Sequence, residues 1–291
     1  MDADKLAAPA PAKINLFLHV TGRRADGYHE LDSLVVFADV GDRLEVAPAD
    51  ELTLEITGPR AAELDAGPDN LVMRAAMALA TRLGAMPGAR MRLEKNLPVA
   101  SGIGGGSADA ACAIKLLARL WGAHPGQHDL SGLALELGAD VPVCLYGRPA
   151  RMGGIGERVE AADGVPDLPA VLVNPGVHVA TPAVFKARQG GFSAPASFAD
   201  MPADRAGWIA ALAGCRNDLE APAMALAPAV TEVLDALAAT GGVRLRRMSG
   251  SGATCFALYD DMAAAEAAAA RLRDAHPDWW VMAATFNGSG T

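Results

Sequence analysis

Residues 98–108 contain four glycines, and an Ala-rich apolar pattern at 110–121 predicts a helix directly after them. Glycine lets the backbone pass close to a bulky ligand, because no Cβ is in the way. The helix start would present free N–H groups and a partial positive charge to an anion. The stretch therefore predicts a phosphate-binding loop. The alternative is a structural turn, in which Ser107 or Asp109 caps the helix and no ligand binds.

The spacing of the glycines excludes two common nucleotide-binding motifs. No Gly-Lys-Ser/Thr follows them, as a Walker A loop requires. The run from Gly102 to Gly106 lacks the G-x-G-x-x-G register of dinucleotide-binding folds, and no acidic residue stands about twenty positions later at a strand end. A phosphate loop of another class is therefore expected.

Asp140 is the carboxylate that the sequence places best for proton transfer. It follows Gly138, which ends a predicted helix, and it precedes Pro142 among apolar neighbours. A carboxylate fixed in such surroundings can take a proton from an alcohol. A loop aspartate can equally cap or turn the chain, so the residues alone leave both interpretations open.

Strands and helices that alternate along the chain must position these groups. Apolar alternation and short apolar runs predict strands at residues 14–20, 31–40, 43–47, 51–57, 90–94, 143–146, 171–173, 243–247, 254–259 and 280–285, with a tight turn at 40–42. Helical periodicity and capping residues predict helices at 71–83, 110–121, 129–137, 181–188, 205–212, 219–225, 230–239 and 262–275. Residues 1–12 are expected to be a loose lead-in, 151–160 a hairpin and 189–203 a linker. This order favours an α+β sandwich.

The composition is that of a folded, acidic protein. The chain has 291 residues, of which 51% are hydrophobic and 20% charged, enough for one large domain or two ordinary ones. A net charge of −9 disfavours nucleic acid and anionic membranes as general partners. No apolar run has the length of a membrane span, and the N-terminus lacks the features of a signal peptide. The four cysteines are scattered, so reduced thiols in the cytoplasm are expected rather than disulfides or a zinc site.

Four stretches of the chain resemble one family. The form Pro-x-x-x-Gly-Ile-Gly-Gly-Gly-Ser-Ala at 98–108 resembles the second motif of the GHMP kinase superfamily, and Ser-Gly-Ser-Gly-Ala at 249–253 resembles the third. Pro-Ala-Lys-Ile-Asn-Leu at 11–16 with Arg-Ala-Asp-Gly-Tyr-His at 24–29, and Leu-Gly-Ala-Asp-Val-Pro at 137–142, resemble the 4-diphosphocytidyl-2-C-methyl-D-erythritol kinases within it. The resemblance covers nearly the whole chain.

The motifs depart from the family pattern at two places. Gly105 and Gly106 stand where most GHMP kinases carry serine, which is a magnesium ligand in some relatives. Ser249 and Ser251 stand where threonine is expected at one or both positions. No protein ligand to a metal is therefore assigned.

The resemblance implies an α+β, two-domain GHMP kinase fold. Residues 1–160 would form an N-terminal ribosomal-protein-S5-like domain and residues 161–291 a C-terminal ferredoxin-like α/β domain, with the active site in the cleft between them. The resemblance also implies ATP with Mg²⁺, and transfer of the γ-phosphate to the 2-hydroxyl of a cytidine diphosphate-linked polyol, 4-diphosphocytidyl-2-C-methyl-D-erythritol, in non-mevalonate isoprenoid precursor synthesis. A cytoplasmic monomer or weak homodimer is expected.

The same resemblance implies roles for individual residues. Asp140 would be the catalytic base and Lys13 its cationic partner, within hydrogen-bond or one-water reach of each other. Without the resemblance, a single lysine before a strand is typical of a solvated surface residue. The phosphates of ATP would be bound by Pro98, Val99, Ala100, Ser101, Gly102, Ile103, Gly104, Gly105, Gly106, Ser107 and Ala108.

The implied substrate-binding residues are Asn15, Tyr28, His29, Thr181 and Phe185. Tyr28 and Phe185 would stack on the cytosine, and His29 would hydrogen-bond its edge. Asn15 and Thr181 would contact the alcohol or phosphate end. The alternatives are a structural His29, a core Phe185 and a helix-capping Thr181.

Three rival functions are open to the sequence. Another GHMP kinase could act on homoserine or mevalonate, against which the Tyr28-His29 pair counts. A catalytically inactive ligand-binding module is disfavoured by the presence of Lys13 and Asp140, and a nucleic-acid binder by the negative charge. Arg244, Arg246 and Arg247 form a basic strand face that could meet phosphate or only solvent.

Overall fold

The computed structural model describes residues 5–84, 88–123, 130–197 and 204–287. They form two compact units. Unit 1 contains Met1–Ala12, Gly41–Val99 and Gly104–Gly147, and unit 2 contains Lys13–Val40, Ala100–Ile103 and Arg148–Thr291. The units are discontinuous in sequence, because β1 (Leu6–Arg23) and β2 (His29–Ala49) each contribute residues to both; the predicted division at residue 160 stays a prediction.

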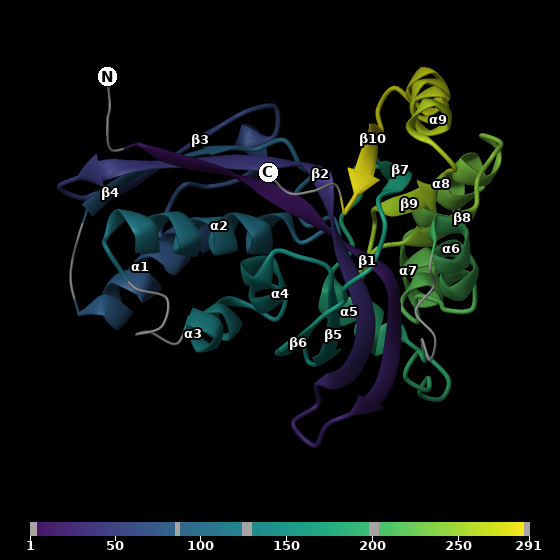
Figure 1. The fold of residues 1–291 in the computed structure, drawn as a ribbon, viewed down its shortest axis with the longest axis horizontal. Helices are drawn as coiled ribbons and strands as arrows, with labels where there is room; N and C mark the ends of the chain where they lie inside the picture. The colour runs from purple at the N-terminus through teal and green to yellow at the C-terminus, as the bar shows by residue number, and fades with distance from the viewer. Residues whose placement is uncertain (1–4, 85–87, 124–129, 198–203, 288–291) are drawn as a thin grey trace. The chain divides into compact units, whose positions relative to one another are not determined.

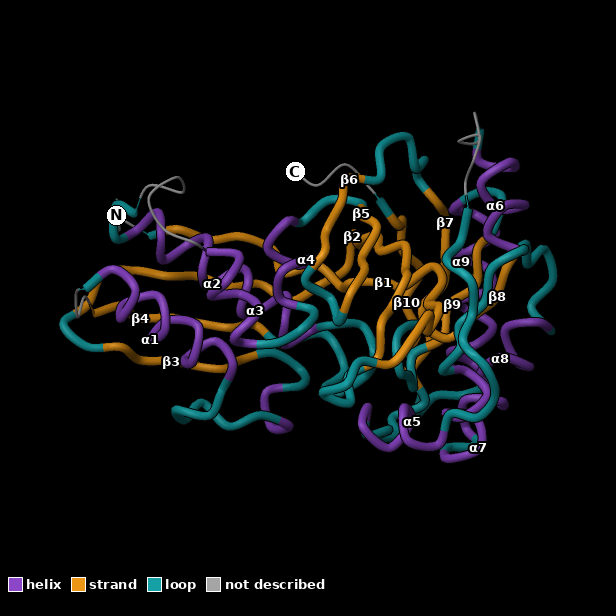
Figure 2. Tube along the Cα trace, turned by 90° about the horizontal axis from the view of Figure 1, so that it is seen from below, coloured by secondary structure: helices purple, strands orange, loops and turns teal. Residues whose placement is uncertain are grey.

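Unit 1 is a sheet covered by helices. β4 (Gly88–Glu94) pairs in antiparallel fashion with the C-terminal part of β2 and in parallel with β3 (Leu52–Thr57). The helices are α1 (Leu71–Leu83), α2 (Gly105–Leu120), α3 (Leu130–Leu137) and α4 (Val141–Tyr146), with a 3₁₀ turn at Ala61–Glu63. Figures 1 and 2 show α1 and α2 lying across one face of these strands. Along β4, Ala89, Met91 and Leu93 are buried while Arg90, Arg92 and Glu94 are exposed, as expected for a half-covered sheet.

The first two strands differ from the sequence prediction. The prediction of a loose lead-in at residues 1–12 is wrong, because β1 begins at Leu6 and includes Pro9 and Pro11. Within the described strands β1 pairs only with β2, and proline is tolerated in such an edge strand. The turn at 40–42 is also wrong, since β2 runs straight through it. A Cβ on Gly41 would lie 2.4 Å from the carbonyl oxygen of Ala10, so this glycine allows close approach of two strands rather than a turn.

The predicted strand at 143–146 is the helix α4. Asp140 stands at its N-cap position and Pro142 in its first turn, where the missing N–H of proline costs nothing. A short apolar run cannot distinguish a buried strand from a buried helical turn by periodicity alone.

Unit 2 contains an antiparallel sheet in the order β10-β7-β9-β8. Its strands are β7 (Leu168–Asn174), β8 (Leu245–Met248), β9 (Cys255–Leu258) and β10 (Trp280–Phe286). Its helices are α5 (Thr181–Ala187), α6 (Arg205–Ala213), α7 (Glu220–Leu226), α8 (Ala229–Ala238) and α9 (Met262–Ala275). The hairpin β5 (Ala150–Gly154) and β6 (Arg158–Ala161) pairs with β2. The succession of β7, helices, β8, β9, α9 and β10 is the predicted ferredoxin-like arrangement.

The described residues carry two further chain-level features. All four cysteines are free thiols, and Cys112, Cys144 and Cys255 are buried. Within the described ranges no single helix has both the length and the apolar character to cross a membrane; only the bent pair α7 and α8 does, by length and composition alone. The predicted linker at 189–203 is irregular chain at 189–197, and its remainder lies outside the described residues.

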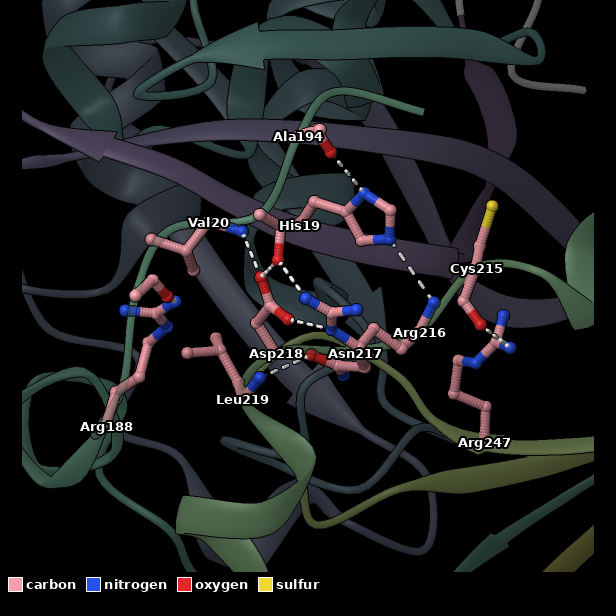
Figure 3. Close-up of polar contacts among 12 residues, drawn as sticks. His19, Val20, Arg188, Ala194, Cys215, Arg216, Asn217, Asp218, Leu219 and Arg247 are labelled. Carbon is pink, nitrogen blue, oxygen red and sulfur yellow. Dashed lines mark hydrogen bonds and ion pairs between the residues drawn. The ribbon is translucent and has the colours of Figure 1, made fainter. Parts of the chain in front are cut away.

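Arg247 does not belong to the predicted basic strand face, whereas Arg244 and Arg246 are exposed. Arg247 is buried, and its guanidinium donates to the carbonyl oxygens of Leu16, Leu212 and Cys215 at 2.5, 3.0 and 2.6 Å. Figure 3 shows Arg247 reaching Cys215. Arg244 instead pairs with Asp260 at the surface. Strand alternation places neighbouring arginines on opposite faces, so the three side chains cannot act together.

Replacing Arg247 by methionine is expected to lower the free energy of unfolding by about 2–4 kcal/mol, because buried carbonyl groups lose their donor. Urea unfolding followed by circular dichroism measures the change. Arg244→Met is the matched control and should leave the urea midpoint nearly unchanged, because its ion pair is exposed. Equal shifts in the two variants would contradict the structural role of Arg247.

Candidate active site

The second half of the glycine-rich loop is the start of α2. This helix begins at Gly105, five residues earlier than predicted, and Gly104 at its N-cap has a φ of +62°. No side chain caps it, and Ser107 and Asp109 lie inside the helix, so the predicted capping alternative is wrong. The first backbone N–H groups of a helix have no partner within it. No side chain occupies them at the cap of α2, and such a helix start favours an anion.

The first half of the loop packs backbone to backbone against the third motif. Gly102 has a φ of +78°, and a Cβ there would lie 2.6 Å from the carbonyl oxygen of Gly252. The N–H of Thr254 donates to the carbonyl of Ser101 at 3.0 Å, and the hydroxyl of Ser249 donates to the carbonyl of Gly102 at 3.2 Å. The third motif therefore sets the course of this half of the loop, and any side chain at Gly102 would push the two segments apart.

A pocket of about 270 Å³ opens beside the loop within unit 1. It is lined by Leu64, Asp65, Asp69, Asn70, Leu71, Val72, Leu93, Gly106 and Asp109. No pattern in the sequence predicted this pocket. Asn70 does cap α1, accepting from the N–H of Val72 at 2.9 Å. Nothing in the sequence spacing indicates that the start of α1 faces the glycine loop.

Lys13 is a buried cation rather than a surface lysine. Only 2% of it is exposed, and its Nζ donates to Oδ1 of Asn15 at 2.9 Å. The amide of Asn15 donates in turn to Oγ of Ser33 at 2.8 Å, and the backbone N–H of Asn15 donates to Oγ of Ser249 at 3.1 Å. This network fixes the amide orientation and with it the ammonium group of Lys13.

Asp140 occupies the N-cap position of α4 and is half-buried. Its side chain makes no capping hydrogen bond, which disfavours the interpretation that it only caps α4. Asp140 belongs to unit 1 and Lys13 to unit 2. The predicted pairing of these two side chains therefore stays a prediction.

Two of the side chains with predicted roles in binding the base lie against each other in unit 2. The rings of His29 and Phe185 are stacked with centroids 4.9 Å apart, and Tyr28 is 61% exposed. Partial burial, aided by the positive charges of Arg23 and Arg188, holds the pKa of His29 below its ordinary value. The imidazole is therefore neutral at pH 7 and can both donate and accept hydrogen bonds.

Thr181 begins α5 but does not cap it. The N-cap residue is Ala180, which has no capping side chain, and Pro182 lies in the first turn. The hydroxyl of Thr181 instead shares a hydrogen bond of 2.7 Å with Oγ of Ser251 in the third motif. The helix-cap alternative for Thr181 is wrong, and its hydroxyl lies beside a second hydroxyl.

Two segments of unit 2 bind to β1, the chain after α5 and the chain between α6 and α7, as Figure 3 shows. The N–H of Arg216 donates to Nε2 of His19 at 3.3 Å. Because Nε2 accepts this bond, Nδ1 of His19 donates to the carbonyl oxygen of Ala194 at 3.1 Å. Asp218 accepts from the N–H of Val20 at 2.7 Å and from the hydroxyl of Ser193 at 2.5 Å. These contacts anchor the chain that leaves the helix carrying Thr181 and Phe185.

Comparison with known proteins agrees with this geometry. The model of the GHMP kinases N terminal domain matches residues 70–148, and that of the GHMP kinases C terminal domain matches residues 198–278. A 4-diphosphocytidyl-2-C-methyl-D-erythritol kinase of Paramagnetospirillum magneticum is 57% identical over 272 residues, which cover 94% of this chain and 95% of that protein. The chain belongs to the 4-diphosphocytidyl-2-C-methyl-D-erythritol kinase family. It is thus a GHMP small-molecule kinase. A 4-diphosphocytidyl-2-C-methyl-D-erythritol kinase of Rhodospirillum rubrum is 52% identical, and the match covers 97% of this chain and 92% of that protein.

Solved structures agree with the assignment to the 4-diphosphocytidyl-2-C-methyl-D-erythritol kinase family. The crystal structure of a 4-(cytidine 5'-diphospho)-2C-methyl-D-erythritol kinase matches with a TM-score of 0.81 and 38% identity, covering 98% of this chain and all of that one. Homoserine kinase from Cytophaga hutchinsonii matches with a TM-score of 0.73 but only 19% identity, covering 100% and 97% of the two chains. The second likeness shows the shared GHMP kinase fold alone.

Proposed function

We propose that this kinase transfers the γ-phosphoryl group of ATP to the 2-hydroxyl of 4-diphosphocytidyl-2-C-methyl-D-erythritol, a step of non-mevalonate isoprenoid precursor synthesis. The observation that carries the proposal is the identity of 57% with a kinase of that name over nearly the full length of both chains. The stacked His29 and Phe185 rings in unit 2 support a substrate that contains a nucleobase.

The loop at residues 98–108 is proposed to bind the phosphates of ATP. The open N-terminus of α2 supports this role, because its N–H groups and dipole favour negative charge. The adjoining pocket of about 270 Å³ is a concave site beside Gly106 and is proposed to receive the adenosine. Within the described residues, no three His, Cys, Asp or Glu side chains are grouped to hold a metal ion. That the Mg²⁺ accompanying ATP has no protein ligand stays a prediction.

Asp140 is proposed to act as the general base. As the substrate oxygen forms its bond to the γ-phosphorus, the hydroxyl proton passes to the Asp140 carboxylate and the bond between the γ-phosphorus and the bridging oxygen breaks, releasing ADP. Lys13 supplies a buried positive charge, and a desolvated cation stabilises charge on the transferring group more than an exposed one does.

Tyr28, His29 and Phe185 are proposed to bind the cytosine, and Asn15 and Thr181 the alcohol and phosphate end. The exposed ring of Tyr28 is free to cover one face of a base, while neutral His29 can hydrogen-bond its edge. Asn15 lies next to Lys13 through their shared hydrogen bond, which supports its place near the reacting alcohol.

Removing either stacking ring, in Tyr28→Ala or Phe185→Ala, is expected to raise KM for the cytidylated substrate about 5- to 100-fold, because stacking on one base contributes about 1–3 kcal/mol. KM for ATP should stay constant. Steady-state kinetics with each substrate varied in turn measures both values. Phe192→Ala removes another exposed aromatic of unit 2 and serves as the matched control. Equal KM changes in the control, or a parallel rise in KM for ATP, would refute base stacking.

ADP release measured with and without the cytidylated alcohol tests the proposed activity itself. Release that requires the alcohol and yields one phosphorylated product per ADP is expected. Release that is no faster than without the alcohol would refute it. The division into domains near residue 160, a cytoplasmic location and a monomer or weak homodimer also remain proposals; the family-model matches at 70–148 and 198–278 lie on either side of that division.

A further inference from the structure

A buried ion cluster lies directly behind the glycine-rich loop, within unit 1. Lys95 follows β4, and its Nζ donates to Oδ2 of Asp42 at 2.5 Å and to Oδ2 of Asp109 at 2.7 Å. The three side chains are only 2%, 0% and 3% exposed. Burying three ionisable groups is costly unless each is paired, so a cluster of this kind needs a reason beyond stability.

The cluster joins the two ends of the loop. Asp42 uses its other oxygen, Oδ1, to accept from the backbone N–H groups of Asn96 at 2.6 Å and Leu97 at 2.9 Å, immediately before the loop begins. Asp109 lies in α2, just after the loop ends. Lys95 connects the two carboxylates, so the start and the end of the loop are held to the same point.

Gly105 completes the fit. A Cβ at this position would lie 3.1 Å from Nζ of Lys95 and 3.7 Å from Oδ2 of Asp42. The ammonium group therefore lies against the first residue of α2, the place where the superfamily usually carries serine. Glycine at 105 leaves the room that the buried lysine occupies.

We propose that Lys95, Asp42 and Asp109 form a loop clamp, a set of positioning residues that holds the N-terminus of α2 in the conformation that binds the phosphates of ATP. This inference rests on the proposed role of the loop in ATP binding. None of the three residues needs to touch the phosphates. Their effect passes through the backbone of residues 96–97 and the first turns of α2.

The clamp also couples ATP binding to pH. Oδ1 of Asp109 has no hydrogen-bond partner among the described residues, and burial raises the pKa of this carboxyl to about 7 against the opposing effect of Lys95. Asp42 adds a negative charge, Asp65 and Asp69 line the same pocket, and burial raises the pKa of Cys112 to about 12, which keeps it neutral. Ionisation of Asp109 gives the clamp a net negative charge behind the phosphate site. ATP affinity should therefore fall as the pH rises through about 7.

The test measures ATP affinity by calorimetry and both KM values by steady-state kinetics on the full chain. Lys95→Met is expected to raise Kd and KM for ATP by at least about tenfold, because small displacements of a binding group cost that much, while KM for the alcohol changes little. Asp109→Asn is nearly isosteric and should flatten the decline in ATP affinity across pH 7. This second variant decides the question if Lys95→Met does not fold.

Lys115→Met is the matched control, because Lys115 also lies on α2 but donates to the carbonyl of Cys144. It should leave Kd for ATP unchanged. An unchanged Kd in Lys95→Met, or a pH dependence in Asp109→Asn identical to that of the wild type, would overturn the clamp. Failure of the proposed function is distinguishable, because the wild type would then bind ATP without phosphorylating the cytidylated alcohol.

Discussion

Replacing Asp140 by asparagine is expected to lower kcat by about a hundred- to ten-thousand-fold, the contribution of a general base. Asparagine keeps the size of the side chain but cannot take the proton of the substrate hydroxyl at neutral pH. Kd for ATP should remain at its wild-type value, and a urea midpoint measured on the same sample separates lost activity from lost folding. Initial rates of ADP release at saturating substrates measure the loss.

The control for this variant is Glu136→Gln, which neutralises an exposed carboxylate of the preceding helix. Its kcat should stay close to that of the wild type. A fall of less than about tenfold in Asp140→Asn would remove Asp140 as base and leave positioning and charge stabilisation to carry the reaction.

Replacing Lys13 by methionine should lower kcat by about a hundred- to a thousandfold, the usual loss when one preorganised group that stabilises transition-state charge is removed. Methionine fills most of the space of a lysine stem, so the effect of the charge is isolated from that of packing. KM for ATP is expected to change much less than kcat, because the stabilisation is greatest in the transition state.

Lys5→Met offers a matched control, since Lys5 lies directly before the same strand but forms a surface ion pair with Glu45. It should show wild-type kinetics. If Lys13→Met retained more than about a tenth of the wild-type kcat, the buried charge would have no catalytic role. A urea midpoint measured on the same sample separates lost activity from lost folding.

Local signals in the sequence predicted elements well where the chemistry is local. Asn70 and Gly84 bound α1 as expected, because a side-chain cap and a left-handed glycine act on their own neighbours. The chain through Gly41 was predicted as a turn and is a strand, because the reason for that glycine is the approach of Ala10, thirty-one residues earlier. The short run at 143–146 was assigned the wrong period for the same lack of local information.

In the candidate site, too, local patterns were predicted from the sequence and contacts between distant residues were not. The motifs that carry the family resemblance predict roles for Lys13, Asp140, the glycine loop and the aromatic residues, and these roles stay predictions. They could not indicate the loop clamp, whose members Asp42, Lys95 and Asp109 come together only through the pairing of β2 with β4 and the packing of α2. The pocket beside Gly106 likewise depends on where α1 begins relative to the loop, which no sequence pattern specifies.

The most direct test of the account is the specificity constant, kcat/KM, for 4-diphosphocytidyl-2-C-methyl-D-erythritol compared with those for homoserine and mevalonate under the same conditions. Stacking by Tyr28 and Phe185 together with hydrogen bonding by His29 predicts a preference of at least about ten-thousandfold for the cytidylated alcohol, the discrimination that a site built to hydrogen-bond its substrate achieves. A specificity constant for homoserine or mevalonate equal to or above that of the cytidylated alcohol would contradict it.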